Sequence, residues 1–268
     1  GGGQNNQAGY YATVSGGELN TALGYHSAVG GGRHNAANAY AANVGGGEYN
    51  TAFARYAVIG GGWGNTASGF LSSVSGGDWN LASSYASAVN GGFWNYAGGY
   101  VSSIGGGSKN AATSYGSGVF GGLWNSASGY VSVIAGGHNN RATVVGTSIG
   151  GGGNNVAVGY YGSIGGGWRN VVGLGASIVG GSANTAFGTH ASIAGGESNT
   201  ANSDYGSIGG GQSNAAGYFA TISGGALNTA LGFHSAIAGG AHNKASSNSA
   251  SIGGGTGNEA TGDFASVG

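Results

Sequence analysis

The chain has 268 residues, of which 67 are Gly and none is Cys, Met or Pro, and its formal net charge at pH 7 is −1. With 6 Lys or Arg and 7 Asp or Glu, it lacks the basic surface that attracts nucleic acid or anionic membranes. The absence of Pro and of a Gly at every third position excludes collagen. Without Cys, no disulfide or thiolate metal site can form.

A pattern centred on Asn recurs along the whole chain and divides it into 18 units, with 14 of the 17 spacings equal to 15 residues and three equal to 14. A unit this short cannot bury an apolar face by itself, so successive units must stack and share one core. We therefore expect one β-solenoid repeat domain over residues 1–268. Because the sequence starts and stops inside the repeat and has no Met, we expect a segment of a longer protein, truncated at both ends.

Each unit begins with a pair of glycines, four and three residues before its Asn, as in Gly16-Gly17 before Asn20. With the Asn numbered as position zero, these glycines stand at −4 and −3. The pair predicts a turn in which a positive φ or a close backbone contact excludes a Cβ. It also marks the start of every coil.

A first short strand is expected from −1 to +3 and a second from +6 to +10. Position +2 is Ala in 17 of 18 units, and +9 holds Val or Ile in the 15-residue units. The Asn and the residue at +2 are two positions apart, and so are the small residue at +7 and the residue at +9. Residues two apart lie on the same face of a strand. Glycines at +4, such as Gly24 and Gly69, predict the turn between the strands. The fold class predicted is an all-β parallel solenoid, or β-roll, with two strands per coil.

Charged residues avoid the positions 0, +2, +7 and +9 in every unit. Since an unpaired buried charge is very costly, these four positions are predicted to face the interior. A buried amide also needs partners, so we expect stacked Asn side chains to bond to one another and to the turn backbone. This predicts a structural ladder that includes Asn20, Asn35, Asn50, Asn65, Asn80, Asn95, Asn110 and Asn125.

No motif indicates catalysis, a cofactor or a metal. The segment from Gly146 to Gly150 matches the nucleophile-elbow pattern, but its Ser148 belongs to a position that is Ser in several other units. The six His are scattered over different positions, which gives no convergent metal cluster. No apolar run reaches the length of a membrane span. We expect neither an enzyme nor direct membrane insertion in this segment.

Aromatic residues gather at two edges of the predicted coil. Fourteen of 18 units carry Tyr or Phe at +5 or +6, either capping the coil or forming an apolar layer between neighbouring chains; a continuous exposed stripe favours the second. The other edge holds all five Trp at −2 or −1, and these either stack on sugar rings or pack between chains. The candidate binding residues there are Trp63, Trp79, Phe93, Trp94, Trp124 and Trp168.

The columns at Ser27-Ala28-Val29-Gly30, Ser207-Ile208-Gly209 and Ser251-Ile252-Gly253, each followed by Asn and Ala, resemble the head repeats of trimeric autotransporter adhesins of the YadA-like type. Similar units occur in phage tail fibres. The resemblance covers the whole chain. It implies a left-handed parallel β-roll, three chains side by side, and an adhesive role at a bacterial or virion surface.

Three functions follow as hypotheses. The first is an extracellular structural and adhesive fibre that self-associates into a homo-oligomer, a trimer by the resemblance, or a filament. The alternative is a phage tail-fibre shaft that binds a receptor, with host or cell-surface glycans or proteins as partners. The third is an ice-binding solenoid, which needs a regular Thr array, whereas position +1 holds Thr only at intervals, with Tyr96 and Arg141 between.

Overall fold

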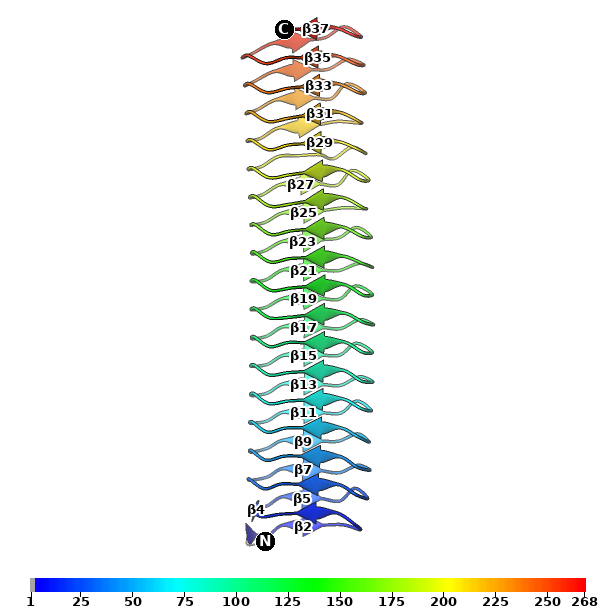
Figure 1. Cartoon of the computed structure of the whole chain (residues 1–268), viewed down its shortest axis with the longest axis vertical. Coiled ribbons are helices and arrows are strands. Elements are labelled where there is room, and N and C mark those ends of the chain that lie inside the picture. The colour runs from blue at the N-terminus through cyan, green and yellow to red at the C-terminus, as the bar shows by residue number, and fades with distance from the viewer. Residues whose placement is uncertain (1–2) are drawn as a thin grey trace. The chain divides into compact units, whose positions relative to one another are not determined.

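The computed structural model describes residues 3–268, which form short strands and no helix. The chain divides into two compact units, Gly1–Gly137 and His138–Gly268, which are called the first unit and the second unit from here on. Each 14- or 15-residue repeat of the sequence forms one coil. Each unit is a stack of coils in which a strand pairs in parallel with its counterpart in the next coil (Figure 1). The predicted all-β parallel solenoid with two short strands per coil is therefore confirmed.

In the first unit, the strands that directly follow the Asn form one sheet, called the first sheet. Its members are β2 (Gln7–Ala8), β5 (Thr21–Ala22), β7 (Ala36–Ala37), β9 (Thr51–Ala52), β11 (Thr66–Ala67), β13 (Leu81–Ala82), β15 (Tyr96–Ala97), β17 (Ala111–Ala112) and β19 (Ser126–Ala127). The second sheet comprises β3 (Thr13–Val14), β6 (Ala28–Val29), β8 (Asn43–Val44), β10 (Val58–Ile59), β12 (Ser73–Val74), β14 (Ala88–Val89), β16 (Ser103–Ile104), β18 (Gly118–Val119) and β20 (Val133–Ile134). A further pair joins β1 (Gly3–Gln4) to β4 (Gly17–Glu18).

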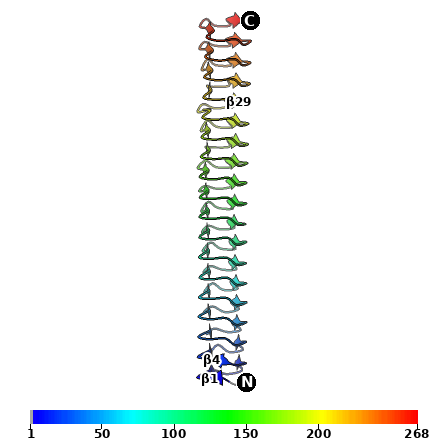
Figure 2. The same ribbon diagram turned by 90° about the vertical axis from the view of Figure 1, so that its left-hand side faces the viewer.

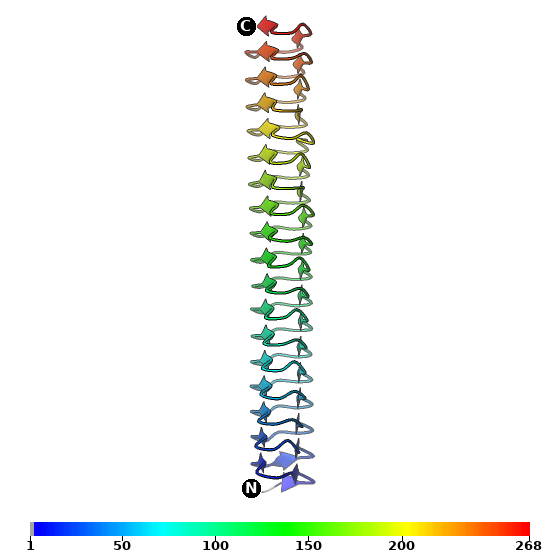
Figure 3. The same ribbon diagram turned by 90° about the vertical axis from the view of Figure 1, so that its right-hand side faces the viewer.

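The second unit repeats this arrangement. Its first-sheet strands are β21 (Arg141–Ala142), β23 (Val156–Ala157), β25 (Val171–Val172), β27 (Thr185–Ala186), β30 (Ala215–Ala216), β32 (Thr229–Ala230), β34 (Lys244–Ala245) and β36 (Glu259–Ala260), with Thr200 bridging β27 and β30. Its second-sheet strands are β22 (Ser148–Ile149), β24 (Ser163–Ile164), β26 (Ser177–Ile178), β28 (Ser192–Ile193), β29 (Ser207–Ile208), β31 (Thr221–Ile222), β33 (Ala236–Ile237), β35 (Ser251–Ile252) and β37 (Ser266–Val267). Within each unit, strands of successive coils lie in columns (Figure 2, Figure 3).

The strands are shorter than the sequence pattern predicts, because two residues in each coil adopt a left-handed conformation. One precedes the Asn, as at His34 (φ 54°), and the other lies in the second turn, as at Tyr56 (φ 58°). A left-handed L-residue costs about 1–2 kcal/mol. The stacking offsets this cost, since Tyr56 donates its N–H to Tyr40 O of the preceding coil at 3.0 Å. The predicted five-residue strands are wrong, and two paired residues remain at each site.

A third pairing site runs along position −2, which the sequence pattern did not predict. In the first unit, isolated parallel bridges connect Glu18 to Arg33, Arg33 to Glu48 and Glu48 to Trp63, and they continue to Leu123. These bridges join the short segments that follow the glycine turn in successive coils. As a result, the outward side chains at −2 form one row along the stack and those at −1 form another, and successive members of each row are one coil apart.

In the 15-residue coils that precede the last coil, the interior consists of Ala at +2, small residues at +7 and Val or Ile at +9, all buried. In the three 14-residue coils, however, the aliphatic residue stands one position earlier, at +8. Ile178 is buried there, whereas Val179, at +9, is 69% exposed. The expectation that +9 faces inward is therefore wrong for these coils. Their turn is one residue shorter, so the residue that pairs with +9 of the preceding coil stands at +8, as Ile178 pairs with Ile164.

The second glycine of each pair is required by its conformation, whereas the first is so constrained only in some coils, as at Gly31 (φ 151°). Gly107 has φ 83°, and a Cβ there would lie 2.8 Å from both Asn110 Nδ2 and Gly122 N. A Cβ at Gly46, by contrast, would meet nothing within 4 Å. At the second turn, the glycines at +4 do not supply the positive φ; Gly24 instead accepts the N–H of Ser27 at 3.0 Å, and His26 between them is left-handed.

Candidate functional site

The predicted Asn residues lie in the coil interior, where they join consecutive coils. Asn20 to Asn125 at the predicted ladder positions are at most 1% exposed. Asn95 donates its backbone N–H to Asn80 Oδ1 (3.0 Å), and its side-chain amide donates to Gly91 O and Gly107 O (both 2.9 Å). Its own Oδ1 accepts the N–H of Asn110 at 3.0 Å. Most contacts thus run from side chain to backbone, and these groups have no freedom to act on a ligand.

Aromatic residues at the second turn of the first unit form a stack, here called the Tyr ladder. Its centroid distances are 4.6–5.5 Å and its interplanar angles 5–14°. The strand register sets this spacing, because equal positions recur about 4.8 Å apart in the direction of pairing. The rings are 39–50% exposed. The members are Phe70, Tyr85, Tyr100, Tyr115 and Tyr130.

Ring stacking in the Tyr ladder closes its aromatic faces to a ligand. Tyr85 and Tyr100 lie 4.6 Å apart at 5°, and Tyr100 and Tyr115 lie 5.3 Å apart at 5°. Each ring face is thus covered by the next ring, and the ring edges with their hydroxyl groups face solvent. Such a surface suits packing against another protein surface better than insertion of a sugar ring.

The Tyr ladder also affects ionisation. Partial burial among the rings raises the pKa of Tyr100 above its ordinary value, and the phenol groups of Tyr85 and Tyr115 raise it further. The unfolded chain would ionise this group near pH 10, whereas the folded chain keeps the proton to higher pH. Stability is therefore expected to fall as pH rises above about 10. An alkaline absorbance titration should show Tyr100 ionising at lower pH in a Tyr85→Asn variant than in the native chain.

The predicted Trp edge is placed on the outer surface at positions −2 and −1. In the first unit, Trp63 and Trp79 meet edge to face at 4.7 Å, and Trp79 and Trp94 lie 6.1 Å apart at an angle of 46°. Phe93 contacts Trp94 with centroids 6.1 Å apart. The structure thus brings these four residues into one cluster.

Trp124 and Trp168 do not share this arrangement. Lys109 Nζ lies 4.3 Å from the centre of a Trp124 ring, which is cation–π distance. In the second unit, Trp168 packs so close to Gly153 that a Cβ on that glycine would lie 2.5 Å from Trp168 Cε3. Arg169 approaches the Trp168 ring at 5.9 Å. These two indoles are covered partly by cations and backbone.

A hollow of about 300 Å³ lies beside the Trp cluster and is here called the Trp hollow. It lies on the corner between positions −1 and +1 over three consecutive coils. Trp79 and Trp94 form one wall, and the outward side chains at +1 form the other. Its lining residues are Gly64, Thr66, Trp79, Asn80, Leu81, Trp94, Asn95 and Tyr96.

The second wall of this hollow was missed in the sequence. In the sequence, Tyr96 only interrupts the row of Thr at +1, and nothing relates Leu81 or Thr66 to the Trp edge. A signal was present: when an Asn points inward, both of its chain neighbours point outward and leave a groove between them. Only the coils that carry large residues at both −1 and +1 can make that groove deep.

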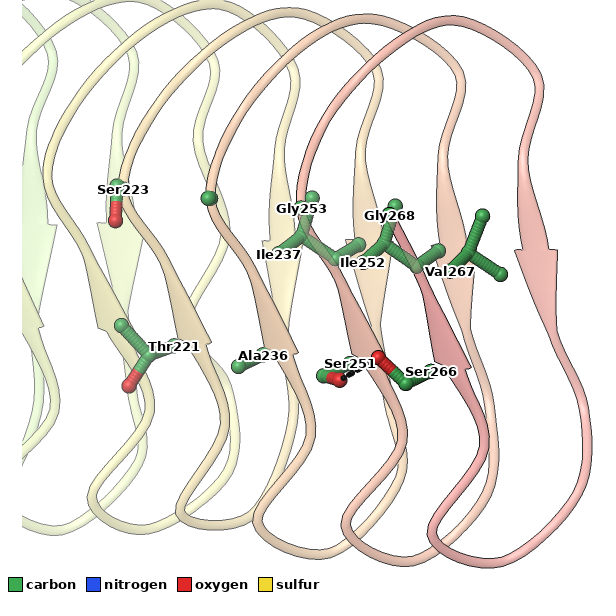
Figure 4. Close-up of a pocket in the computed structure, with 11 residues that line it drawn as sticks. Thr221, Ser223, Ala236, Ile237, Ser251, Ile252, Gly253, Ser266, Val267 and Gly268 are labelled. Carbon is green, nitrogen blue, oxygen red and sulfur yellow. Dashed lines mark hydrogen bonds between the residues drawn. The ribbon is translucent and has the colours of Figure 1, made fainter.

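A second hollow lies at the second sheet of the second unit, between residues 221 and 268 (Figure 4). It is lined by Ser, Thr, Gly and aliphatic residues, such as Thr221, Ile252 and Val267. Ser251 Oγ donates to Ser266 Oγ at 3.2 Å. It contains no charged or aromatic side chain, so it offers neither an acid–base pair nor a stacking surface.

Among residues 3–268, no group of three His, Cys, Asp or Glu side chains could hold a metal ion. Ser148 Oγ donates to Ser163 Oγ at 3.2 Å, as one of a row of surface hydroxyls. Within the same range, no helix has the length and apolar character needed to cross a bilayer.

The outer surface of the coils thus presents two aromatic features of different geometry. The Tyr ladder is a closed stack of parallel rings, and the Trp hollow is an open wedge between tilted indoles. Comparison with models of known protein families and with curated proteins finds no match for this chain.

Proposed function

We propose that this chain is an adhesive structural segment of an extracellular fibre, displayed on a bacterial surface or a virion, which self-associates into a homo-oligomer or filament. The observation on which this rests is the Tyr ladder, an exposed aromatic row that continues over five consecutive coils. An exposed apolar patch of this extent is typical of an interaction surface. The resemblance to trimeric adhesin heads supports three chains side by side.

The charge distribution supports self-association. Within the Tyr ladder, positions +5 from Phe70 to Tyr130 carry no charged residue. Identical chains could therefore approach along this face without like-charge repulsion, and aromatic residues are enriched at such interfaces. A repetitive surface also presents the same contact many times, so weak individual contacts add up to strong attachment.

A triple variant, Tyr85→Asn, Tyr100→Asn and Tyr115→Asn, tests this role. The chain itself carries Asn248 at the equivalent position, so the fold should tolerate the change. Because aromatic anchors dominate interface energies, we expect the concentration for half-association to rise at least about tenfold. Sedimentation velocity over a range of concentrations measures the concentration for half-association. Attachment of protein-coated beads to surfaces measures adhesion.

The matched control replaces two exposed Phe residues outside the Tyr ladder, Phe53→Asn and Phe120→Asn. Both are more exposed than the ladder residues, at 65% and 62%, and other units carry Asn38 and Asn90 at the same positions. Association should be unchanged in this control. A native chain that stays monomeric at every concentration and fails to retain beads would contradict the proposal.

A second candidate function, a glycan-binding shaft, is favoured by one specific observation. The Trp hollow combines two indoles with Thr66, whose side chain carries a hydroxyl group, and with Tyr96. A concave site lined mainly by aromatic groups, with a few polar groups, is typical of small-ligand recognition. This candidate is compatible with the first, because adhesion needs a receptor contact as well as a structural segment.

A further inference from the structure

The Trp hollow differs from the Tyr ladder in that its rings do not stack in parallel. Trp79 and Trp94 are tilted by 46° with centroids 6.1 Å apart, whereas the rings of the Tyr ladder are parallel within 14°. Tilted rings at this distance form a wedge that is open toward solvent. Trp94 is also the most exposed Trp, at 55%.

The surrounding residues hold this wedge in place. A Cβ at Gly64 would lie 3.0 Å from Trp79 Cδ2 and Cε3, so the Trp79 indole rests directly on that glycine. Trp63 supports its other edge at 4.7 Å. On the opposite wall, Tyr96 OH lies 3.4 Å from Ser83 Oγ, which orients the phenol along the sheet. These contacts within the chain fix the walls of the hollow, which lowers the cost of ordering them on binding.

The chemistry of the lining selects the ligand class. All eight lining residues are uncharged, and the nearest acidic neighbour along the chain is Asp78, adjacent to Trp79. An anionic sugar or a phosphate would find no cation in the lining and a carboxylate beside it. Indole faces attract the electropositive C–H face of a pyranose ring through their quadrupole. Thr66 offers a hydroxyl partner for its equatorial groups, whereas the Tyr96 hydroxyl bonds to Ser83.

We propose that the Trp hollow binds a neutral pyranose unit of an oligosaccharide, with its C–H face on the Trp79–Trp94 wedge and its hydroxyl groups toward Thr66. This inference rests on the proposed adhesive role and adds its ligand class and residues. A volume of about 300 Å³ is at the lower end of small-molecule sites, which suits one ring of a longer chain. Trp124 does not form a second such wedge, because its neighbours at position −1 in the adjacent coils are Lys109 and Asn139, and Lys109 lies over one of its ring faces.

Titration with soluble oligosaccharides tests the proposal. The probes are cellotetraose, maltotetraose, chitotetraose and, as an anionic comparison, sialyllactose, followed by intrinsic Trp fluorescence and saturation-transfer NMR. The variants are Trp79→Asn and Trp94→Asn, since the chain itself places Asn139 and Asn154 at this left-handed position (φ 53° and 54°). The variants should therefore keep the fold, which circular dichroism and thermal melting check.

We expect at least one neutral tetrasaccharide to bind, with affinity lowered about tenfold or more in each of the two variants. The matched control, Trp124→Asn, removes an exposed Trp at the same position of another coil and should leave affinity unchanged. Absence of binding by all three neutral probes, preference for sialyllactose, or equal losses in the control would overturn the proposal. Because these probes are soluble, their binding is read separately from self-association and bead attachment.

Discussion

Replacing Gly77 by Ala is expected to lower the free energy of unfolding by about 3 kcal/mol or more. Gly77 has φ 81°, where an L-residue costs about 1–2 kcal/mol. Its new Cβ would also overlap the carbonyl oxygen of Gly92 and lie 2.7 Å from Gly92 N and 2.8 Å from Asn80 Nδ2. Since these atoms belong to backbone and to a hydrogen-bonded side chain, the coils must move apart. Urea denaturation measures the loss.

Gly76→Ala is the matched control, one residue earlier in the same coil. A Cβ there would meet nothing within 4 Å, and the backbone is not left-handed. We expect a change within about 0.5 kcal/mol, or a small gain from reduced freedom of the unfolded chain. If both substitutions destabilised the chain equally, the two glycines would have the same role, which would contradict the difference that the structure shows between them.

Asn95→Ala is the second large effect, with an expected loss of about 3–5 kcal/mol. The substitution removes the acceptor of the buried Asn110 N–H and the donor to Gly91 O. Each unpaired buried group costs about 1–3 kcal/mol, and the missing amide leaves a void as well. Gly107 O suffers less, because it also accepts the N–H of Phe93 at 2.9 Å. Equilibrium denaturation and local hydrogen exchange report the change.

Two comparisons make this result specific. Asn90→Ala removes an exposed amide from the preceding coil and should change stability by less than about 0.5 kcal/mol. Asn95→Asp keeps an acceptor for Asn110 but directs a carboxylate toward two carbonyl oxygens, so it should be at least as harmful as Ala. An Asp variant as stable as the native chain would argue against the hydrogen-bond directions described above.

The inward-facing positions could be predicted from the sequence because their chemistry is strict. Charge is absent from them, Ala recurs at +2, and an Asn at every coil must find partners. These constraints come from burial, which acts on residue type. The partners themselves were only partly foreseen, since the amide of Asn95 bonds chiefly to Gly carbonyls and to a neighbouring backbone N–H.

The turns were less predictable, because their strain is balanced by contacts between coils. Trp79 and His26 occupy left-handed conformations that sequence reasoning assigns to Gly. Each is held by the stack; Trp79, for instance, donates its N–H to Trp63 O at 2.9 Å. No local pattern reports such a bond. The same reason explains the missed pairing at position −2, which arises only once coils are stacked.

The candidate site shows a similar division. The Trp residues were predicted from their edge position, but the hollow depends on which of them are tilted, covered or flanked. Lys109 covers Trp124, and Gly64 makes room for Trp79. Tyr96 and Leu81 complete the opposite wall. These are relations between neighbouring coils, so they become visible only when the register between coils is known.

Hydrogen–deuterium exchange of Asn amides, followed by NMR, tests the central claim most directly: the ladder Asn face inward and join each coil to the next. The backbone N–H groups of Asn35, Asn65 and Asn110 each donate to the Oδ1 of the preceding ladder Asn and should exchange slowly, together with their side-chain amides. The side-chain amide of Asn90, which is exposed, should exchange rapidly. Ladder amides that exchange as fast as Asn90 would contradict the account.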